Sequence, residues 1–238
     1  MVSGLTDNLQ EFLPQIYQLL RNQFGYLDWW PGETPFEVIV GAILTQNTSW
    51  TNVEKAIYNL KSVGALSPEG ILALNVDDSR SDGNSLPILI KPSGYFNQKS
   101  KRLQIIAKWV MNRCQGDLSM LESVTTPDLR NELLGVIGIG PETADCILLY
   151  GFNRLVFVVD TYTNKSMNRI GICNEDISYG ELQNLFVQNL DDDIDLYNDF
   201  HAQIVALGKY HCKPRPLCEN CPLSGICKYG LNKNRRVT

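Results

Sequence analysis

Four cysteines near the end of this 238-residue chain constrain its fold most strongly, because side chains that hold one metal must lie together. They are Cys212, Cys218, Cys221 and Cys227, with the spacing C-x5-C-x2-C-x5-C. Four thiolates can bind zinc or a [4Fe–4S] cluster. A zinc ribbon usually has two short C-x2-C knuckles, whereas this chain has one, flanked by longer arms. The spacing therefore favours a [4Fe–4S] cluster over zinc, and favours unligated thiols least.

The remaining cysteines, Cys114, Cys146 and Cys173, are predicted to be thiols of the core. The chain begins MVSGLTDNLQEF, which has neither the basic start nor the apolar centre of a signal peptide. No apolar run approaches the roughly 18 residues of a membrane span. We therefore expect a cytoplasmic protein whose cysteines bind metal or are buried rather than form disulfides.

The charge of the chain is distributed unevenly. The formal net charge of −5 argues mildly against nucleic-acid binding, because phosphates are neutralised by Lys and Arg. Residues 99–113 nevertheless hold five basic side chains and no acidic one, whereas residues 190–199 are acidic. One face of the protein can therefore be basic despite the net charge.

Apolar residues recur at helical spacing along most of the chain, which predicts an all-α fold. Helices are expected over 9–24, 35–44, 53–60, 103–110, 127–134, 181–190 and 196–209, the second of them starting at a capping box from Thr34 to Glu37. Residues 156–159 have strand propensity but no partner strand, so we expect a buried extended segment. The polar stretch 76–87 is expected to be a surface loop without chemistry.

A glycine-rich hairpin is predicted between two of the helices. Residues 134–144 read LGVIGIGPETA, and Pro141 suits the first position of the second helix. Glycine lets the backbone approach a partner, and N–H groups at the start of a helix can bind a phosphate. A glycine turn between helices is more often only a turn, so this motif gains weight only if other features agree.

Asp160 follows the buried extended segment and precedes Thr161. Its simplest role is the N-cap of a helix, which aspartate suits well. The functional alternative is a carboxylate at the mouth of a cleft, where it stabilises positive charge on a sugar or deprotonates water. Both roles can hold together.

Aromatic side chains gather around the end of the first helix and the start of the third. Trp29, Trp30 and Trp50 occur near Pro31 and Gln46. Aromatic planes beside polar groups can sandwich an extruded base, and stacking is worth about 1–3 kcal/mol per base. Ordinary core packing is the alternative.

Taken together, GIGPETA, VVDTYT and the cysteine quartet resemble the helix-hairpin-helix DNA glycosylases of the endonuclease III superfamily, along essentially the whole chain. The segments LTQNT, KPSGYFNQKSKR and GIGPETADCILLY look most like the 3-methyladenine DNA glycosylase III branch, although that branch lacks the cysteines. The resemblance implies a two-lobed helical fold. One domain comprises residues 1–34 plus 151–238 and carries the cluster loop, and the other comprises residues 35–150 and contains the hairpin.

The resemblance also implies roles for individual residues. Asp160 stands at the position of the catalytic aspartate, and Gln46 at that of a residue filling the gap left by a flipped nucleotide. The hairpin residues Ile137, Gly138, Ile139 and Gly140 stand where DNA phosphate is gripped, and Trp29, Trp30, Pro31 and Trp50 align with the aromatic walls of an alkylpurine pocket. The cluster would hold the C-terminal loop in shape and present Lys213, Arg215 and Lys228 to phosphates.

Glu142 occupies the place of the lysine with which bifunctional members form a Schiff base. A carboxylate cannot form that imine, so AP-lyase activity is expected to be weak or absent. We therefore predict a monomeric, nucleoid-associated, monofunctional glycosylase that removes damaged, 3-methyladenine-like purines from double-stranded DNA with a flipped base. The alternatives are a glycosylase for deaminated or mismatched bases and a non-catalytic iron–sulfur DNA-binding protein.

Overall fold

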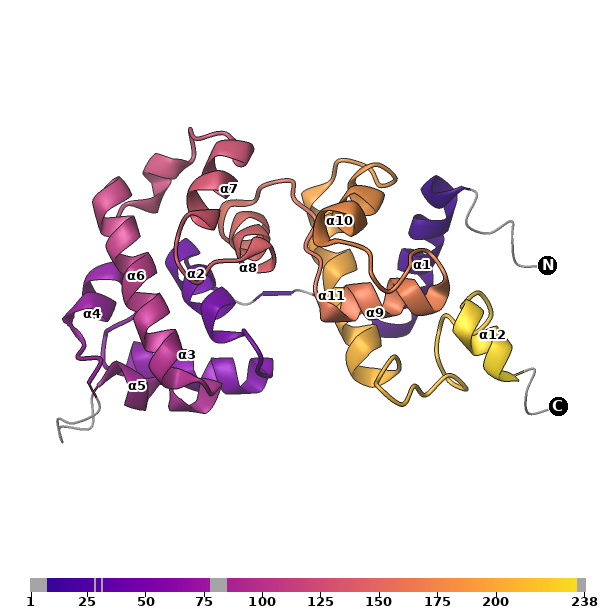
Figure 1. Ribbon diagram of the computed structural model, residues 1–238, viewed down its shortest axis with the longest axis horizontal. Helices are drawn as coiled ribbons and strands as arrows, with labels where there is room; N and C mark the ends of the chain where they lie inside the picture. The colour runs from indigo at the N-terminus through magenta and orange to yellow at the C-terminus, as the bar shows by residue number, and fades with distance from the viewer. Residues whose placement is uncertain (1–7, 28, 31, 78–84, 235–238) are drawn as a thin grey trace. The chain divides into compact units, whose positions relative to one another are not determined.

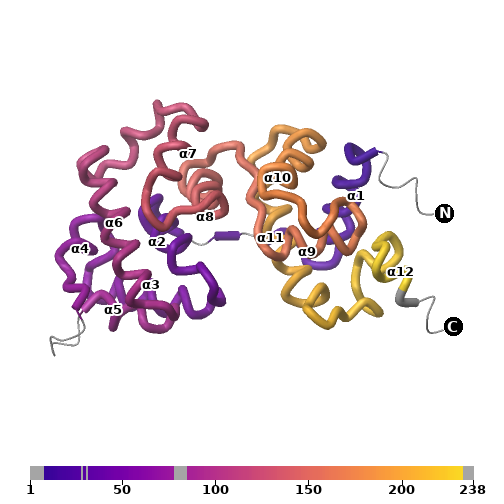
Figure 2. The backbone as a smooth tube through the Cα atoms, viewed as in Figure 1, coloured from indigo at the N-terminus to yellow at the C-terminus, as the bar shows by residue number. Residues whose placement is uncertain are grey.

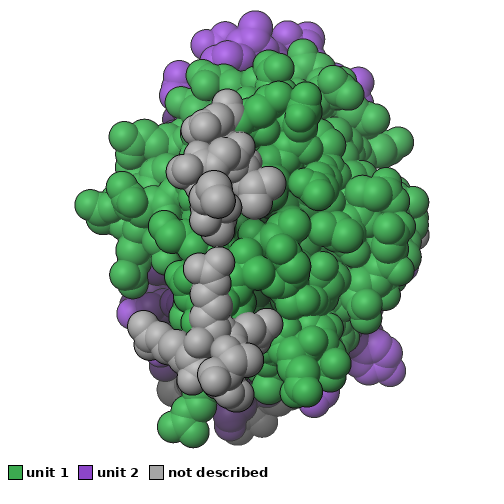
Figure 3. Space-filling view, turned by 90° about the vertical axis from the view of Figure 1, so that its right-hand side faces the viewer, with its two compact units in different colours: residues 1–29, 155–238 green, residues 30–154 purple. Residues whose placement is uncertain are grey.

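The computed structural model describes residues 8–27, 29, 30, 32–77 and 85–234, and those residues form helices and turns but no strand (Figures 1 and 2). The all-α prediction is confirmed. No helix in the described ranges is long and apolar enough to cross a membrane. The chain divides into two compact units, residues 1–29 with 155–238 and residues 30–154, which Figure 3 colours separately. The boundaries expected from the sequence, at residues 34 and 150, lie a few residues from these.

The unit of residues 30–154 is built from helices that surround α2. Its α-helices are α2 Pro35–Leu44, α3 Trp50–Ser62, α4 Pro68–Ala73, α5 Leu86–Leu89, α6 Phe96–Cys114, α7 Thr126–Leu134 and α8 Pro141–Cys146, with short 3-10 helices η1 Lys91–Ser93 and η2 Leu118–Leu121 and the π-helix η3 Ile147–Gly151. Helix α2 is apolar nearly all round and packs against α3, α6, α8 and η3. A helix with apolar residues on every face belongs in the core.

The start of α2 follows the predicted capping pattern only in part. The Thr34 hydroxyl accepts a hydrogen bond from the Glu37 N–H, as expected. The Glu37 carboxylate instead accepts from the Glu33 N–H and pairs with Lys61 at 3.0 Å. The reciprocal half of the capping box is therefore absent, because a basic side chain of α3 draws the Glu37 carboxylate away.

The predicted surface loop over 76–87 is partly wrong. Residues 78–84 lie outside the described part of the chain, but Ser85, Leu86 and Pro87 are buried, and α5 begins at Leu86. Two consecutive apolar residues after a polar run gain more from burial against α6 than from exposure. The polar composition of the stretch concealed this short helix.

The other unit joins the first helix to the C-terminal part of the chain. It contains α1 Leu9–Phe24, α9 Thr161–Ile170, α10 Tyr179–Val187, α11 Ile194–Tyr210 and α12 Lys228–Asn234, with α11 packed against α1 and α9 (Figure 1). Its aromatic core stacks Phe157 on Phe186, with ring centroids 4.0 Å apart. Residues 156–159 are buried extended chain as predicted, and Gln183 donates to the Phe157 carbonyl at 2.7 Å, which satisfies a backbone group without a partner strand.

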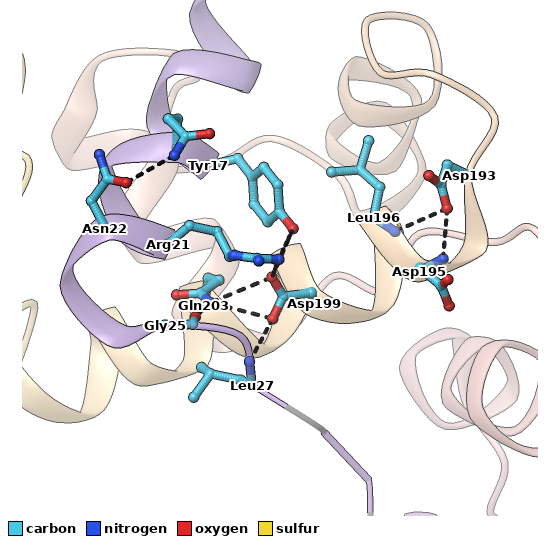
Figure 4. A network of polar contacts seen from close by, with 11 residues as sticks. Tyr17, Arg21, Asn22, Gly25, Leu27, Asp193, Asp195, Leu196, Asp199 and Gln203 are labelled. Atoms are coloured by element: carbon cyan, nitrogen blue, oxygen red, sulfur yellow. Dashed lines mark hydrogen bonds and ion pairs between the residues drawn. The ribbon is translucent and has the colours of Figure 1, made fainter.

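A buried carboxylate ties the segment after α1 to α11, as Figure 4 shows. Asp199 accepts hydrogen bonds from the Tyr17 hydroxyl at 2.7 Å, the Leu27 N–H at 2.9 Å and the Gln203 amide at 3.2 Å, and pairs with Arg21 at 3.2 Å. Burial, and then the hydrogen bond to Asp199, raises the pKa of Tyr17 to about 12. Asp199 is thus buried and surrounded by donors.

A buried lysine makes the stability of the unit of residues 30–154 depend on pH. The Lys99 ammonium donates to the Leu44 carbonyl at 2.8 Å and the Ser93 carbonyl at 2.7 Å. Burial, with a smaller contribution from the charge of Arg102, lowers the Lys99 pKa from 10.5 to about 8. Between these values the folded protein has lost a proton that the unfolded chain retains, so this group makes unfolding less favourable as the pH rises.

We therefore expect the unfolding free energy of wild type, relative to a Lys99→Met variant, to increase between pH 8 and pH 10. Comparing the two proteins cancels the pH dependence of the other ionisable groups. Urea denaturation at several pH values measures the difference in unfolding free energy. A difference that stayed constant over this range would contradict the lowered pKa.

Candidate functional site

The predicted hairpin is present between α7 and α8. Residues 135–140 turn the chain, Ile137 at the tip is 76% exposed, and Gly138 has φ +94°, which side chains rarely adopt. Helices α7 and α8 are braced by Arg130, whose guanidinium binds the buried Asp145 carboxylate at 2.6 and 3.0 Å. The hairpin thus presents an exposed tip at Ile137, and an ion pair joins the helices on either side of it.

Gln46 lies against this hairpin. Its amide nitrogen donates to the Gly138 carbonyl at 3.2 Å and to the Thr143 hydroxyl at 3.0 Å, and its amide oxygen accepts from the Arg102 guanidinium. A Cβ on Gly138 would come within 2.7 Å of the Arg102 side chain, so the two residues touch. Sequence reasoning paired neither Arg102 nor Thr143 with Gln46, although Arg102 belongs to the basic segment 99–113.

Trp30 and Trp50 meet in an aromatic cluster completed by Tyr150. The Trp30 ring stacks on Tyr150 with centroids 4.9 Å apart and planes 15° apart, and it meets Trp50 edge to face at 4.9 Å. Both indoles contact the position where Gly41 lacks a side chain. Sequence reasoning did not predict Tyr150 as part of this cluster, because an aromatic residue at helical spacing is typical of any core position. Pro31 lies outside the described residues.

Trp29 belongs to the unit of residues 1–29 and 155–238, whereas Trp30 and Trp50 belong to the other unit. Of the four residues predicted to form the walls of a base pocket, the structure therefore brings Trp30 and Trp50 together. Trp30 has φ 72°, a strained conformation for an aromatic residue, which a closely packed environment must maintain.

Asp160 is the N-cap of α9, as one of its two predicted roles requires. Its Oδ1 accepts from the Thr163 N–H at 2.7 Å and the Thr163 hydroxyl at 2.8 Å, and the hydroxyl accepts from the Asp160 N–H in return. This capping box holds the carboxylate through one oxygen. The Asp160 side chain is 12% exposed, and Oδ2 lies 3.8 Å from Nε2 of His201.

His201 is a residue of the site that sequence reasoning missed. It lies on α11, which packs closely on α9: a Cβ on Gly208 would stand 2.1 Å from the Tyr162 ring. Burial lowers the pKa of the His201 imidazole, and the charge of Asp160 opposes this only in part. A lone histidine in an apolar helix gives no sequence signal of the aspartate beside it.

The four cysteines lie in the loop between α11 and α12, and two of them, Cys212 and Cys227, contact Arg169 of α9. The Arg169 guanidinium donates to the Cys212 sulfur at 3.4 Å and the Lys213 carbonyl at 2.6 Å, and the Cys227 thiol donates to the Arg169 carbonyl at 3.3 Å. Burial, with smaller contributions from the other three cysteines, raises the pKa of Cys221 to about 11.

The residue types in this loop are those that bind an iron–sulfur cluster, although the described residues do not form a metal site. All four cysteines belong to this one loop, and thiolate is the ligand that iron–sulfur clusters use. In the described ranges, however, no three His, Cys, Asp or Glu side chains are arranged to hold a metal. Lys213, Arg215 and Lys228 are exposed, as the prediction requires.

Residues 40–191 match the model of the HhH-GPD superfamily of base excision DNA repair proteins. The chain is also 43% identical, over 94% of its length and 99% of the other, to a protein of Methanocaldococcus jannaschii with the provisional name DNA repair glycosylase. The chain belongs to the HhH-GPD superfamily. It is a DNA glycosylase of this superfamily, and the predicted relationship is confirmed.

Relatives of known name and structure agree with this assignment. Endonuclease III of Thermotoga maritima is 30% identical over 82% of this chain and 83% of its own. An endonuclease III–DNA complex has the same fold, with a TM-score of 0.79 at 21% identity over 95% of this chain and 98% of that one. A 3-methyladenine DNA glycosylase of H. pylori bound to 1,N6-ethenoadenine has a TM-score of 0.70 at 30% identity, over 85% and 97%.

Proposed function

We propose that this HhH-GPD glycosylase releases alkylated purines of the 3-methyladenine type from double-stranded DNA, with Asp160 as its catalytic residue. The observation that carries the proposal is the anchoring of Asp160 through Oδ1 alone, which leaves Oδ2 for the reaction. The aromatic cluster of Trp30, Trp50 and Tyr150 supports a purine substrate, since a flipped base stacks on such rings. The 3-methyladenine DNA glycosylase of H. pylori is a relative at 30% identity.

The chemistry needs little more than these groups. The bond between C1′ of the sugar and the purine nitrogen breaks, and its electron pair leaves with the base. A cationic alkylpurine is a good leaving group, and aromatic faces attract it. The negative charge of Asp160 stabilises the oxocarbenium-like sugar, a water oxygen then bonds to C1′, and the proton lost by that water passes to solvent.

DNA binding would use the hairpin and residues around it. The exposed tip of the hairpin, together with Arg102 beside Gly138, suits contact with phosphate. Glycosylases must extrude their target base, and the solved complexes of related fold contain DNA. Gln46 would fill the space that the base leaves, and to do so its amide must release the contacts to Gly138 and Thr143.

The enzyme is proposed to be monofunctional, because Glu142 stands in the first turn of α8, where a Schiff-base lysine is expected in bifunctional members. We expect wild type to release free 3-methyladenine from alkylated duplex DNA, without strand breaks and without a covalent adduct after borohydride reduction. Chromatography of the released bases and denaturing electrophoresis of the DNA measure this. A bifunctional endonuclease III provides the positive control for nicking and trapping.

Other results of this base-release experiment would distinguish the alternative functions. Release of uracil, hypoxanthine or mismatched thymine, with no alkylpurine, would overturn the alkylpurine assignment while leaving the glycosylase intact. Tight DNA binding with no base released from any of these duplexes would establish a non-catalytic protein. Borohydride trapping of wild type would contradict the argument from Glu142.

We propose further that Cys212, Cys218, Cys221 and Cys227 hold a [4Fe–4S] cluster, which would fix the loop that carries Lys213 and Arg215. We expect anaerobically purified protein to contain about four irons per chain and to absorb visible light, and Cys218→Ser to lose both. Cys173→Ser is the matched control, since Cys173 lies outside the quartet. Stoichiometric zinc without iron would overturn the proposal.

A further inference from the structure

The Asp160 carboxylate has one oxygen that the capping box does not use. Thr163 occupies Oδ1 through its N–H and its hydroxyl. Oδ2 faces Nε2 of His201 at 3.8 Å, and the two side chains are 12% and 5% exposed. The oxygen left for the reaction therefore lies beside an imidazole in a nearly buried position.

The packing of α9 and α11 sets the distance between Asp160 and His201. Asp160 begins α9, and His201 lies in the buried middle of α11, where side chains have little freedom to move. The contact of Tyr162 with Gly208 holds the two helices close together. The 3.8 Å separation between Nε2 and Oδ2 is too long for a hydrogen bond. An approach closer by about 0.6 Å would form one, since such bonds extend to about 3.2 Å.

The charge state of the imidazole determines what this neighbour can do. Burial lowers the pKa of His201, so the ring is neutral near pH 7. An imidazolium would cancel the negative charge that Asp160 must offer to a cationic sugar. A neutral ring can donate one N–H without cancelling that charge.

We propose that His201 is a positioning residue that holds the Asp160 carboxylate by directing its Nε2–H at Oδ2. This inference rests on the proposed function of Asp160. His201 touches neither the sugar nor the base in this role. Its effect is to keep Oδ2 turned toward the reacting carbon as positive charge develops there, since misplacement by about 1 Å can cost a factor of 10² in rate.

The first test separates rate from binding in single-turnover experiments with alkylated duplex DNA. We expect His201→Leu to lower the rate of base release by about 10²-fold with an unchanged DNA dissociation constant. His201→Gln, whose amide can donate to Oδ2, should recover most of the rate. Tyr197→Phe is the matched control, because it removes a buried hydroxyl one turn earlier on α11.

The second test does not depend on activity. The chain has only two histidines, so nitrogen-15 NMR of the rings distinguishes His201 from His211. We expect a neutral Nε2–H tautomer at His201, with signals that move in Asp160→Asn while those of His211 stay in place. Wild-type turnover in His201→Leu, or unmoved His201 signals in Asp160→Asn, would overturn the inference. A wild type that releases no base would defeat the proposed function, and NMR would still decide the role of His201.

Discussion

Asp160→Asn is expected to lower the rate of base release by about 10³-fold or more while the protein remains folded and binds DNA. Asparagine is as good an N-cap as aspartate, so its oxygen can still accept from the Thr163 N–H and hydroxyl. The group that replaces Oδ2 is an uncharged NH2, which cannot stabilise a cationic sugar. Single-turnover base release and DNA binding by fluorescence anisotropy measure the two properties separately.

Asp193→Asn is the matched control for this prediction. Asp193 caps α11 in the same unit, accepting from the N–H groups of Asp195 and Leu196 at 2.8 and 3.2 Å, as Figure 4 shows. The same chemical change is made at another N-cap of the unit, so full activity is expected. If Asp160→Asn released base at the wild-type rate, Asp160 would be a helix cap and nothing more.

Asp199→Ala is expected to cause the largest loss of stability, about 3–5 kcal/mol in the free energy of unfolding. The substitution leaves the Tyr17 hydroxyl, the Leu27 N–H and the Gln203 amide without the acceptor they share, and Arg21 without its ion-pair partner (Figure 4). The Gln203 amide keeps the Gly25 carbonyl at 2.6 Å, but the Tyr17 hydroxyl and the Leu27 N–H lose an acceptor, and a donor shielded from water without a partner is costly. Urea denaturation followed by circular dichroism measures the effect.

Two further variants test this explanation. Asp199→Asn should be less damaging, because its amide oxygen can still accept from the Leu27 N–H. Arg113→Ala removes an exposed ion pair, 2.8 Å from Glu132, and should leave the denaturation midpoint nearly unchanged, since water screens such pairs. Equal midpoints for Asp199→Ala and wild type would show that the network contributes little to folding.

Local sequence signals were enough to predict the helical fold and several details of the site. The spacing of apolar residues predicted α1 and the buried α2, whose bounds of 9–24 and 35–44 agree with the structure. The N-cap role of Asp160 and the glycine hairpin before α8 were predicted because caps and turns depend on residues only a few positions apart. Helices α10 and α11 begin two residues earlier than predicted, because Ser178 and Asp193 cap them ahead of the first periodic apolar residue.

The partners of the site residues depended on packing. Gln46 meets Arg102 from 56 positions away, and Asp160 meets His201 across two helices. Trp30 stacks on Tyr150, and Asp199 binds a segment more than 170 positions earlier. Periodicity shows which face of a helix is buried, but not which other face it meets, because that depends on the fit of whole surfaces. Local order therefore followed from neighbouring residues, whereas the surroundings of the Asp160 carboxylate arose only when distant helices came together.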